Sequence, residues 1–296
     1  MSSSSTPPPQ PTEARGDSTY DDRSLASAVG LLDRGREGVQ SVAVLTDEEL
    51  MALDGVETAQ LTAMPFLDEH APDLESRVLL ARTAMRSLMT RKEVATEIEV
   101  AEFEERPLAD EKLLDVTVDP TILGALVLRR TSRDLVWFER EVSTQTHRLY
   151  YYPHDSDIVL EEEVTADGVH MFSIMPLPTV AARVRHLIDQ PGVGGQDGPV
   201  STLAVTALED DADLGPRLGD TRALTIGTMV SRVDDTAKRV TFHMTGSEVI
   251  AGQPSSDGEE ISLMAVSPTS VEEIVRDLFD DGSEDDAEGD AADGTR

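Results

Sequence analysis

The sequence predicts an α+β fold: a duplicated, pseudo-two-fold antiparallel sheet with helices on one face, additional N-terminal helices and disordered tails. Three observations predict it. Apolar residues recur at helical spacing up to about residue 130. From Asp134 onward, short segments rich in β-branched and aromatic residues alternate with polar turns, as in antiparallel strands. The pattern after Asp134 then occurs a second time at a constant offset, which indicates an internal duplication.

Both ends of the chain differ in composition from the rest. Residues 1–22 hold a serine run and Pro7, Pro8, Pro9 and Pro11, and they lack the basic start and apolar core of a secretory signal. Residues 280–296 carry eight acidic residues and one arginine. Neither segment has enough apolar surface to offset the entropy of ordering, so we expect a disordered tail at each end.

The whole chain is strongly acidic. Its 296 residues include 25 Lys plus Arg and 58 Asp plus Glu, a formal charge of −33. A phosphate backbone is repelled by such a field unless one face is locally basic, so nucleic acid is not the expected partner. The chain has no cysteine, which excludes disulfides and thiolate chemistry, and no apolar run long enough to span a membrane. We expect a cytoplasmic protein.

The region 23–130 is predicted to be mainly helical. Thr46 and Glu49 have the spacing of a capping box at the start of a helix over 46–54. The longest helix of this region is predicted within 73–95, where apolar residues recur every three or four positions. A third helix is predicted to start at Asp119 as the N-cap, because the proline that follows suits the first helical position.

The region 134–188 is predicted to be one half-repeat, with four strands and a closing helix. The Asp167-Gly168 turn indicates a hairpin, and Thr179 is the expected helix cap. The four strands are expected at 135–142, 148–152, 158–164 and 169–175.

A glycine-rich linker, 189–200, is predicted to join this unit to a second half-repeat, 201–279. The last helix is expected to begin at Ser270, with Glu273 completing a capping box. Together with the N-terminal helices, the two half-repeats are predicted to form a single domain, 23–279. The strands of the second half-repeat are expected at 223–233, 238–244, 247–251 and 259–266.

The duplication is indicated most directly by one ungapped shift. Val180 aligns with Val271, and 271 − 180 = 91. The same shift preserves strand order and the length of the polar turn that follows Val142 and Val233. It also superimposes Val184, Arg185 and Leu187 on Val275, Arg276 and Leu278, and Arg148 on Arg239.

Signatures of catalysis and of metal binding are missing. No histidine pair has the helical spacing of a zinc protease, and the glycines at 192–198 are not followed by the Lys-Ser/Thr of a phosphate loop. We therefore predict no catalytic residue, no metal and no cofactor. An alternative hypothesis is a metal-dependent hydrolase built on His147, His154 and His170.

Two groups of side chains are candidates for binding. Trp137, Tyr150 and Tyr152 lie on two adjacent predicted strands, and exposed aromatic residues often mark partner surfaces. Burial under a helix is the competing interpretation for these rings. The second group is a basic helix face with Arg82, Arg86, Arg91 and Lys92, which supports an alternative hypothesis of a nucleic-acid-binding regulator.

The order of elements over residues 45–279 resembles the EspG-like ESX secretion-associated chaperones of type VII secretion. The resemblance rests on an opening element, Leu45-Thr46-Asp47-Glu48-Glu49-Leu50, followed by a helix containing Arg82-Thr83-Ala84-Met85-Arg86-Ser87-Leu88 and by two strand-rich halves that each end in a helix. It implies a pseudo-two-fold α+β fold. It also implies a non-enzymatic chaperone or adaptor that binds secreted helical-hairpin substrates of the PE–PPE or WXG-like kind.

Overall fold

The computed structural model describes residues 20–280 except 104, 106, 108–114, 144, 155–156 and 235. Most of the two predicted disordered tails, 1–22 and 280–296, lies outside the described residues. The described part begins with a helix that the sequence does not predict, α1 (Asp22–Arg36), whose first turn is capped by Asp21. The folded part therefore starts slightly before residue 23.

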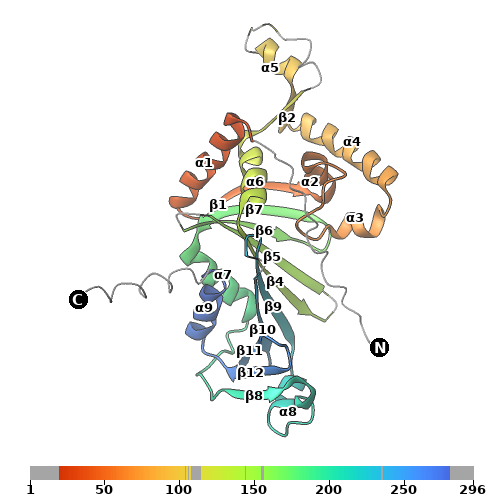
Figure 1. Ribbon diagram of the computed structural model, residues 1–296. Coiled ribbons are helices and arrows are strands. Elements are labelled where there is room, and N and C mark those ends of the chain that lie inside the picture. The colour runs from red at the N-terminus through yellow and green to blue at the C-terminus, as the bar shows by residue number, and fades with distance from the viewer. Residues whose placement is uncertain are drawn as a thin grey trace, which may run out of the picture.

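One ten-stranded sheet runs through the molecule (Figure 1). Neighbouring strands are antiparallel throughout, in the order β1-β7-β6-β5-β4-β9-β10-β11-β12-β8. The predicted α+β class and duplicated antiparallel sheet are confirmed, and both halves share the one sheet. The first half contributes β1 (Gln40–Thr46), β4 (Asp134–Val142), β5 (Gln145–His154), β6 (Ile158–Val164) and β7 (Val169–Pro176). The second contributes β8 (Ser201–Ala204), β9 (Ala223–Ser231), β10 (Ala237–Met244), β11 (Val249–Pro254) and β12 (Glu260–Ala265).

The pairing of β4 with β9 reveals the pseudo-two-fold axis. If a two-fold axis relates β4 to β9, each residue of β4 is equivalent to the residue 91 positions later in β9. The axis passes through the one cross-strand pair whose two members are equivalent to each other. Trp137 pairs with Thr228, and 228 − 137 = 91. The axis therefore passes through this pair, perpendicular to the sheet, and the offset found in the sequence is the offset of the fold.

The two helices that close the half-repeats, α7 (Leu177–Ile188) and α9 (Pro268–Asp277), pack together on one face of the sheet (Figure 1). They bury alternate residues of the central strands, including Phe138 of β4 and Phe242 of β10. The two arginines that the duplication aligns, Arg185 and Arg276, both donate to Glu272 at 2.9 Å. The two repeat helices are thus joined by one carboxylate.

The first turns of these helices differ from the prediction. Helix α7 begins directly after Pro176, so Thr179 is not its cap. Helix α9 is capped by Ser267, whose Oγ accepts from the Ser270 N–H at 3.2 Å, so the predicted capping box opened by Ser270 is wrong. A proline in the first turn of each helix has its φ already fixed for helix, which moves both starts toward the N-terminus.

The N-terminal helices cover the opposite face of the first half. With β5, β6 and β7 they enclose a second core that includes Tyr152 and Phe172. The helices predicted at 46–54, within 73–95 and after Asp119 are confirmed, as is the Thr46–Glu49 capping box. These helices are α1, α2 (Asp47–Asp54), α3 (Pro65–His70), α4 (Leu74–Thr90) and α6 (Pro120–Thr131).

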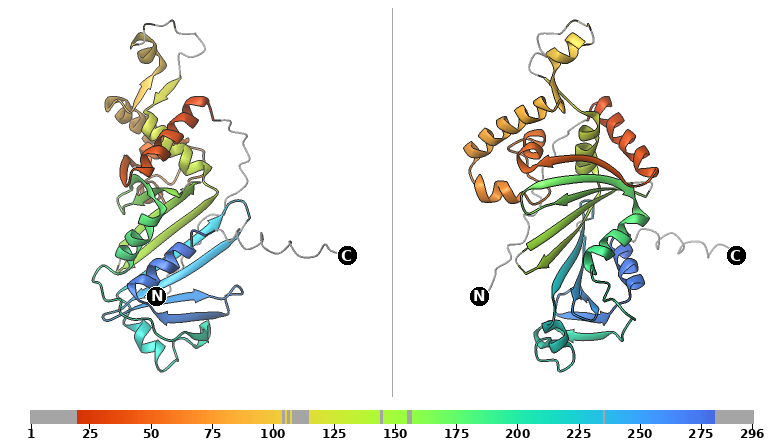
Figure 2. Two further views of the ribbon diagram at one scale, coloured as in Figure 1. Left: turned by 90° about the vertical axis from the view of Figure 1, so that its left-hand side faces the viewer. Right: turned by 180° about the vertical axis from the view of Figure 1, so that it is seen from behind.

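A small arm projects from this helical layer (Figure 2). It consists of β2 (Val94–Thr96), β3 (Val116–Val118) and the short helix α5 (Glu97–Phe103). Strands β2 and β3 pair only with each other, as a separate two-stranded sheet. No helix in the described part of the chain is long and apolar enough to cross a bilayer.

The second half has a much thinner cover on that same face. A 3-10 turn (Val205–Ala207) and helix α8 (Leu214–Gly219) pack a third, small core around Leu214, Ile250 and Leu263. The connection 189–200 contains no helix or strand. It is held at its start by Asp189, which accepts from the Val193 and Gly194 N–H groups at 2.8 Å.

Candidate functional site

The centre of the sheet is left uncovered between the two helical layers. Side chains of β9 alternate strictly: those toward α7 and α9 are buried, whereas Leu224, Ile226, Thr228 and Val230 on the other face are only half-buried. None of the three buried clusters among the described residues includes Leu224, Ile226 or Val230. An antiparallel sheet commonly leaves one face to solvent, but the side chains on that face are then polar. Three of these four side chains are apolar, so this strip is a candidate site.

The register assigns β4 and β10 residues to the same surface. Leu135 pairs with Val230, Trp137 with Thr228, and Thr228 in turn with Arg239. Leu135 and Trp137 are half-buried at the margin of the N-terminal core. We call this surface the central sheet face, defined by Leu135, Trp137, Leu224, Ile226 and Val230, and the pseudo-two-fold axis passes through its middle.

Charged groups border the central sheet face. Glu139 is neutralised by Arg148, whose Nε lies 2.9 Å from the carboxylate. Arg239 is exposed, and no hydrogen bond or ion pair of its side chain is found within the described residues. Arg232 donates to the carbonyls of Arg130 and Ser132, at 3.3 and 3.4 Å, and so links the β9–β10 turn to the C-terminus of α6.

A buried ionic network fixes the helical layer that forms one wall of the site. Arg129 of α6 is fully buried and donates to Glu162 of β6 and to Asp54 of α2, both at 2.8 Å. His170 of β7 bridges Glu162 at 2.6 Å and Asp47 at 2.7 Å. The network ties two helices to two strands, so it determines where the cover of the sheet ends.

These contacts shift the pKa values of Glu162 and His170 in opposite directions. Burial alone raises the pKa of Glu162, but Arg129 and His170 more than offset it and hold the pKa well below its usual range. Burial alone lowers the pKa of His170, but hydrogen bonds to Asp47 and Glu162 raise it. Both ring nitrogens of His170 thus face carboxylate oxygens, and the side chain of Asp47 also accepts the Phe66 N–H at 2.8 Å.

The three aromatic residues proposed from the sequence are separated by burial. Tyr152 is fully buried, and its hydroxyl donates to Glu162 at 2.5 Å. Tyr150 is 6% exposed, and its hydroxyl accepts from the Ala63 N–H at 3.3 Å. Both rings belong to the core beneath the N-terminal helices. Of the three, only Trp137 contributes to the accessible central sheet face.

The basic helix face is also divided. Arg91 binds Glu49 at 2.6 Å and Glu93 at 2.5 Å, so its charge is neutralised. Arg82, Arg86 and Lys92 are exposed and form no ion pair within the described residues. Arg82 and Arg86 belong to α4, which lies on the outer side of the helical layer, away from β4 and β9 (Figure 1).

The histidines of the hydrolase hypothesis are not brought together. His147 pairs with Arg140 and therefore points to the face covered by α7 and α9. His170 lies on the opposite face, in the ionic network, and His154 contacts the Leu128 carbonyl at 3.1 Å. Among the residues that the structure describes, no group of three potential ligands could hold a metal ion.

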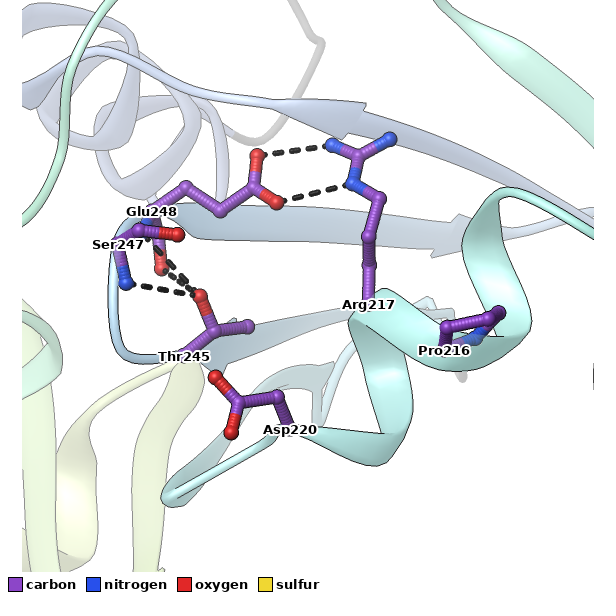
Figure 3. Close-up of a pocket in the computed structure, with 6 residues that line it drawn as sticks. All are labelled: Pro216, Arg217, Asp220, Thr245, Ser247 and Glu248. Carbon is purple, nitrogen blue, oxygen red and sulfur yellow. Dashed lines mark hydrogen bonds and ion pairs between the residues drawn. The ribbon is translucent and has the colours of Figure 1, made fainter.

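A shallow polar pocket of about 250 Å³ lies beside α8, lined by Pro216, Arg217, Asp220, Thr245, Ser247 and Glu248 (Figure 3). Its one cation, Arg217, donates to Glu248 through both Nε and Nη2, at 2.9 and 2.8 Å. Because this ion pair is internally satisfied, the pocket offers an anionic ligand no free cation, and we assign no function to it.

Comparison with known proteins gives a likeness of fold. No family model and no curated protein sequence matches the chain. One similar solved structure is the Mycobacterium tuberculosis type VII secretion system chaperone EspG5 in complex with a PE25–PPE41 dimer. The identity is 9% and the TM-score 0.51, over 80% of this chain and 95% of the matched chain. The chain therefore has an EspG-like fold.

Sequence reasoning missed both the central sheet face and the ionic network. The alternation in β9 is visible in the sequence as Leu224, Ile226 and Val230, but nothing local shows that this side lacks a cover. The network joins Asp47 to His170 across 123 positions, so no local pattern could indicate it.

Proposed function

We propose that this protein is a non-catalytic cytoplasmic chaperone or adaptor that binds a helical-hairpin substrate of type VII secretion, of the PE–PPE or WXG-like kind. The EspG-like fold supports the class. The observation that carries the proposal is the central sheet face, an uncovered apolar surface at the junction of the two halves. Such surfaces on soluble proteins mark sites of partner binding.

Trp137 is the natural anchor of this interface. It lies on the pseudo-two-fold axis, with aliphatic side chains from β4 and β9 around it. Tryptophans at the centre of an interface are frequent hot spots, and removing one typically costs ≥ 2 kcal/mol of binding, roughly 30-fold in Kd. An apolar helical-hairpin end laid across β4 and β9 would bury Trp137 and Ile226 together.

The test is co-expression with PE–PPE and WXG-like proteins encoded in the same genome, followed by size-exclusion chromatography with light scattering. We expect a one-to-one complex with at least one of them and a change in the emission of Trp137, the only tryptophan. Failure to recover a complex with any such substrate would overturn the proposal.

Matched variants locate the interface. Ile226→Glu places a charge in the central sheet face and is expected to weaken binding at least tenfold. Leu79→Glu makes the same kind of change at a side chain that is 65% exposed on α4 and is expected to leave the affinity unchanged. Equal effects of the two substitutions would place the interface elsewhere.

A further inference from the structure

The end of the central sheet face nearest the β9–β10 turn carries arginines without carboxylate partners. Arg239 lies in the same cross-strand row as Trp137 and Thr228. Arg133, just before β4, is exposed, and its carbonyl accepts from the Arg232 N–H at 2.8 Å. Asp234 in the turn and Asp134, which interacts electrostatically with Arg232, offset two of the three charges, which leaves a local excess of one positive charge on a chain of net charge −33.

The described chain ends beside this cluster. Lys238 donates through Nζ to the carbonyls of Asp277 and Asp280, so the residue preceding the C-terminal segment is attached to β10. Strand β11 pairs with β10 only from Thr241 to Met244. Strand β11 ends at Pro254, which is opposite Arg239 in the same register, so Ala237 and Lys238 at the start of β10 have β9 as their only neighbouring strand. The last described residue, Asp280, lies beside this part of β10.

The segment that follows has the complementary charge and the necessary reach. It contains Asp281, Glu284, Asp285, Asp286, Glu288, Asp290 and Asp293 against one arginine, Arg296. Its 16 residues, 281–296, span about 53 Å when extended and about 20 Å as a relaxed coil. A sheet with its side chains is about 10 Å thick.

We propose that the acidic segment 281–296 crosses the β9–β10 hairpin and docks on the arginines at this end of the central sheet face, where it competes with the client. The competition rests on the proposed function, because it requires a client. The contact between the segment and the arginines does not. The segment has no apolar residue larger than alanine, so its docking is electrostatic. A client that buries Trp137 can therefore displace it.

The chain is well suited to a direct test, because it has one tryptophan and no cysteine. A nitroxide attached at Ala287→Cys in the full-length protein would quench Trp137 on contact. A nitroxide at Ser5→Cys, near the other end of the chain, is the matched control. We expect about twofold quenching from position 287 at 0.01 M salt, where the Debye length is about 30 Å, and its loss near 1 M, where that length is about 3 Å.

Charge variants of the labelled protein identify the docking site. Arg239→Glu is expected to abolish the quenching from position 287, whereas Arg82→Glu on α4, the same change at another exposed arginine, is expected to leave it intact. Circular dichroism confirms that each variant is folded. Equal quenching from positions 5 and 287, or equal effects of the two charge reversals, would overturn the proposal.

The outcome is independent of the proposed function because no client is present. Quenching without client binding would support the tail contact and refute the chaperone role. Client binding without quenching would refute only the tail contact. If both the tail contact and client binding are observed, replacing the seven acidic residues of the segment with Asn or Gln should raise the affinity for the client at low salt. An unchanged affinity would refute the competition.

Discussion

Replacing Arg129 with methionine tests whether the buried ionic network holds the helical layer on the sheet. Arg129 is fully buried and donates to Glu162, Asp54 and Thr62. Removing one partner of a buried ion pair typically costs about 3–5 kcal/mol, because the remaining charge stays desolvated. Two contacts survive in the variant: His170 still binds Glu162, and Arg130 still lies 2.9 Å from Asp54. We therefore expect the lower end, about 3 kcal/mol.

The assay is urea unfolding followed by far-UV circular dichroism. With a slope of about 2–3 kcal/mol per molar urea, Arg129→Met should lower the midpoint by about 1–1.5 M. Arg140→Met is the matched control, since Arg140 is 5% exposed and its Nε has no hydrogen-bond partner among the described residues. A methionine there removes a buried N–H that has no partner, so the change should be neutral or stabilising by about 1 kcal/mol.

Combining Arg129→Met with Glu162→Gln separates two contributions to the destabilisation: the lost Arg129–Glu162 attraction and the cost of leaving Glu162 buried without a cation. If the cost of Arg129→Met comes from an uncompensated Glu162, the double variant should be less destabilised than the sum of the two single variants, by about 1–3 kcal/mol. The reasoning is refuted if Arg129→Met and Arg140→Met have equal effects, or if the two network substitutions are strictly additive.

The pKa of His170 is raised in the folded state. The protonated side chain therefore contributes its full stabilisation below the unfolded pKa of about 6.5, and this stabilisation is lost as pH rises through the folded pKa. Urea midpoints measured from pH 6 to 9 should fall in the parent protein and change less in His170→Gln. In thermal melts, Gly124→Ala should destabilise the protein by about 1–3 kcal/mol, because an added Cβ would lie 2.6 Å from the Ser27 carbonyl oxygen of α1. In the control Gly30→Ala, the added Cβ meets nothing within 4 Å, so this variant should be neutral or slightly stabilised. Ser267→Ala should cost about 1 kcal/mol by removing the cap of α9, and a larger loss in Ser270→Ala would contradict this assignment of the cap.

The sheet was predictable because its determinants are local. Each strand after Asp134 has its own alternation and its own turn, and the offset of 91 residues in the sequence reappears as the Trp137–Thr228 pair. Helices with a cap or a first-turn proline, such as those after Thr46 and Asp119, were predictable for the same reason. Helix α1 was missed because its apolar residues are diluted by a polar segment that continues from the N-terminus.

The site was less predictable because it is defined by the absence of a covering helix over one face of β9. Tyr150, Tyr152 and Trp137 look alike in the sequence, and alternation places all three on one face of the sheet. Their exposure is decided by the position of the N-terminal helices, which is set by ion pairs such as Arg129–Asp54, 75 residues apart. Only the assembled cover shows that Trp137 lies at its margin and the two tyrosines beneath it.

The location of the central sheet face follows from unequal insertions into a symmetric frame. The edge strand of the first half is followed by residues 47–133 before β4, and that of the second half by only 205–222 before β9. The long insertion covers β5, β6 and β7, and the short one packs at the far edge around Ile250 and Leu263. The long insertion reaches only the first-half side of the axis, where it contacts Leu135 and Trp137, and the short one does not reach the axis. At the axis the two halves contribute one strand each. A partner bound there contacts both halves at once, so separating the halves would remove the site even if each half kept its fold.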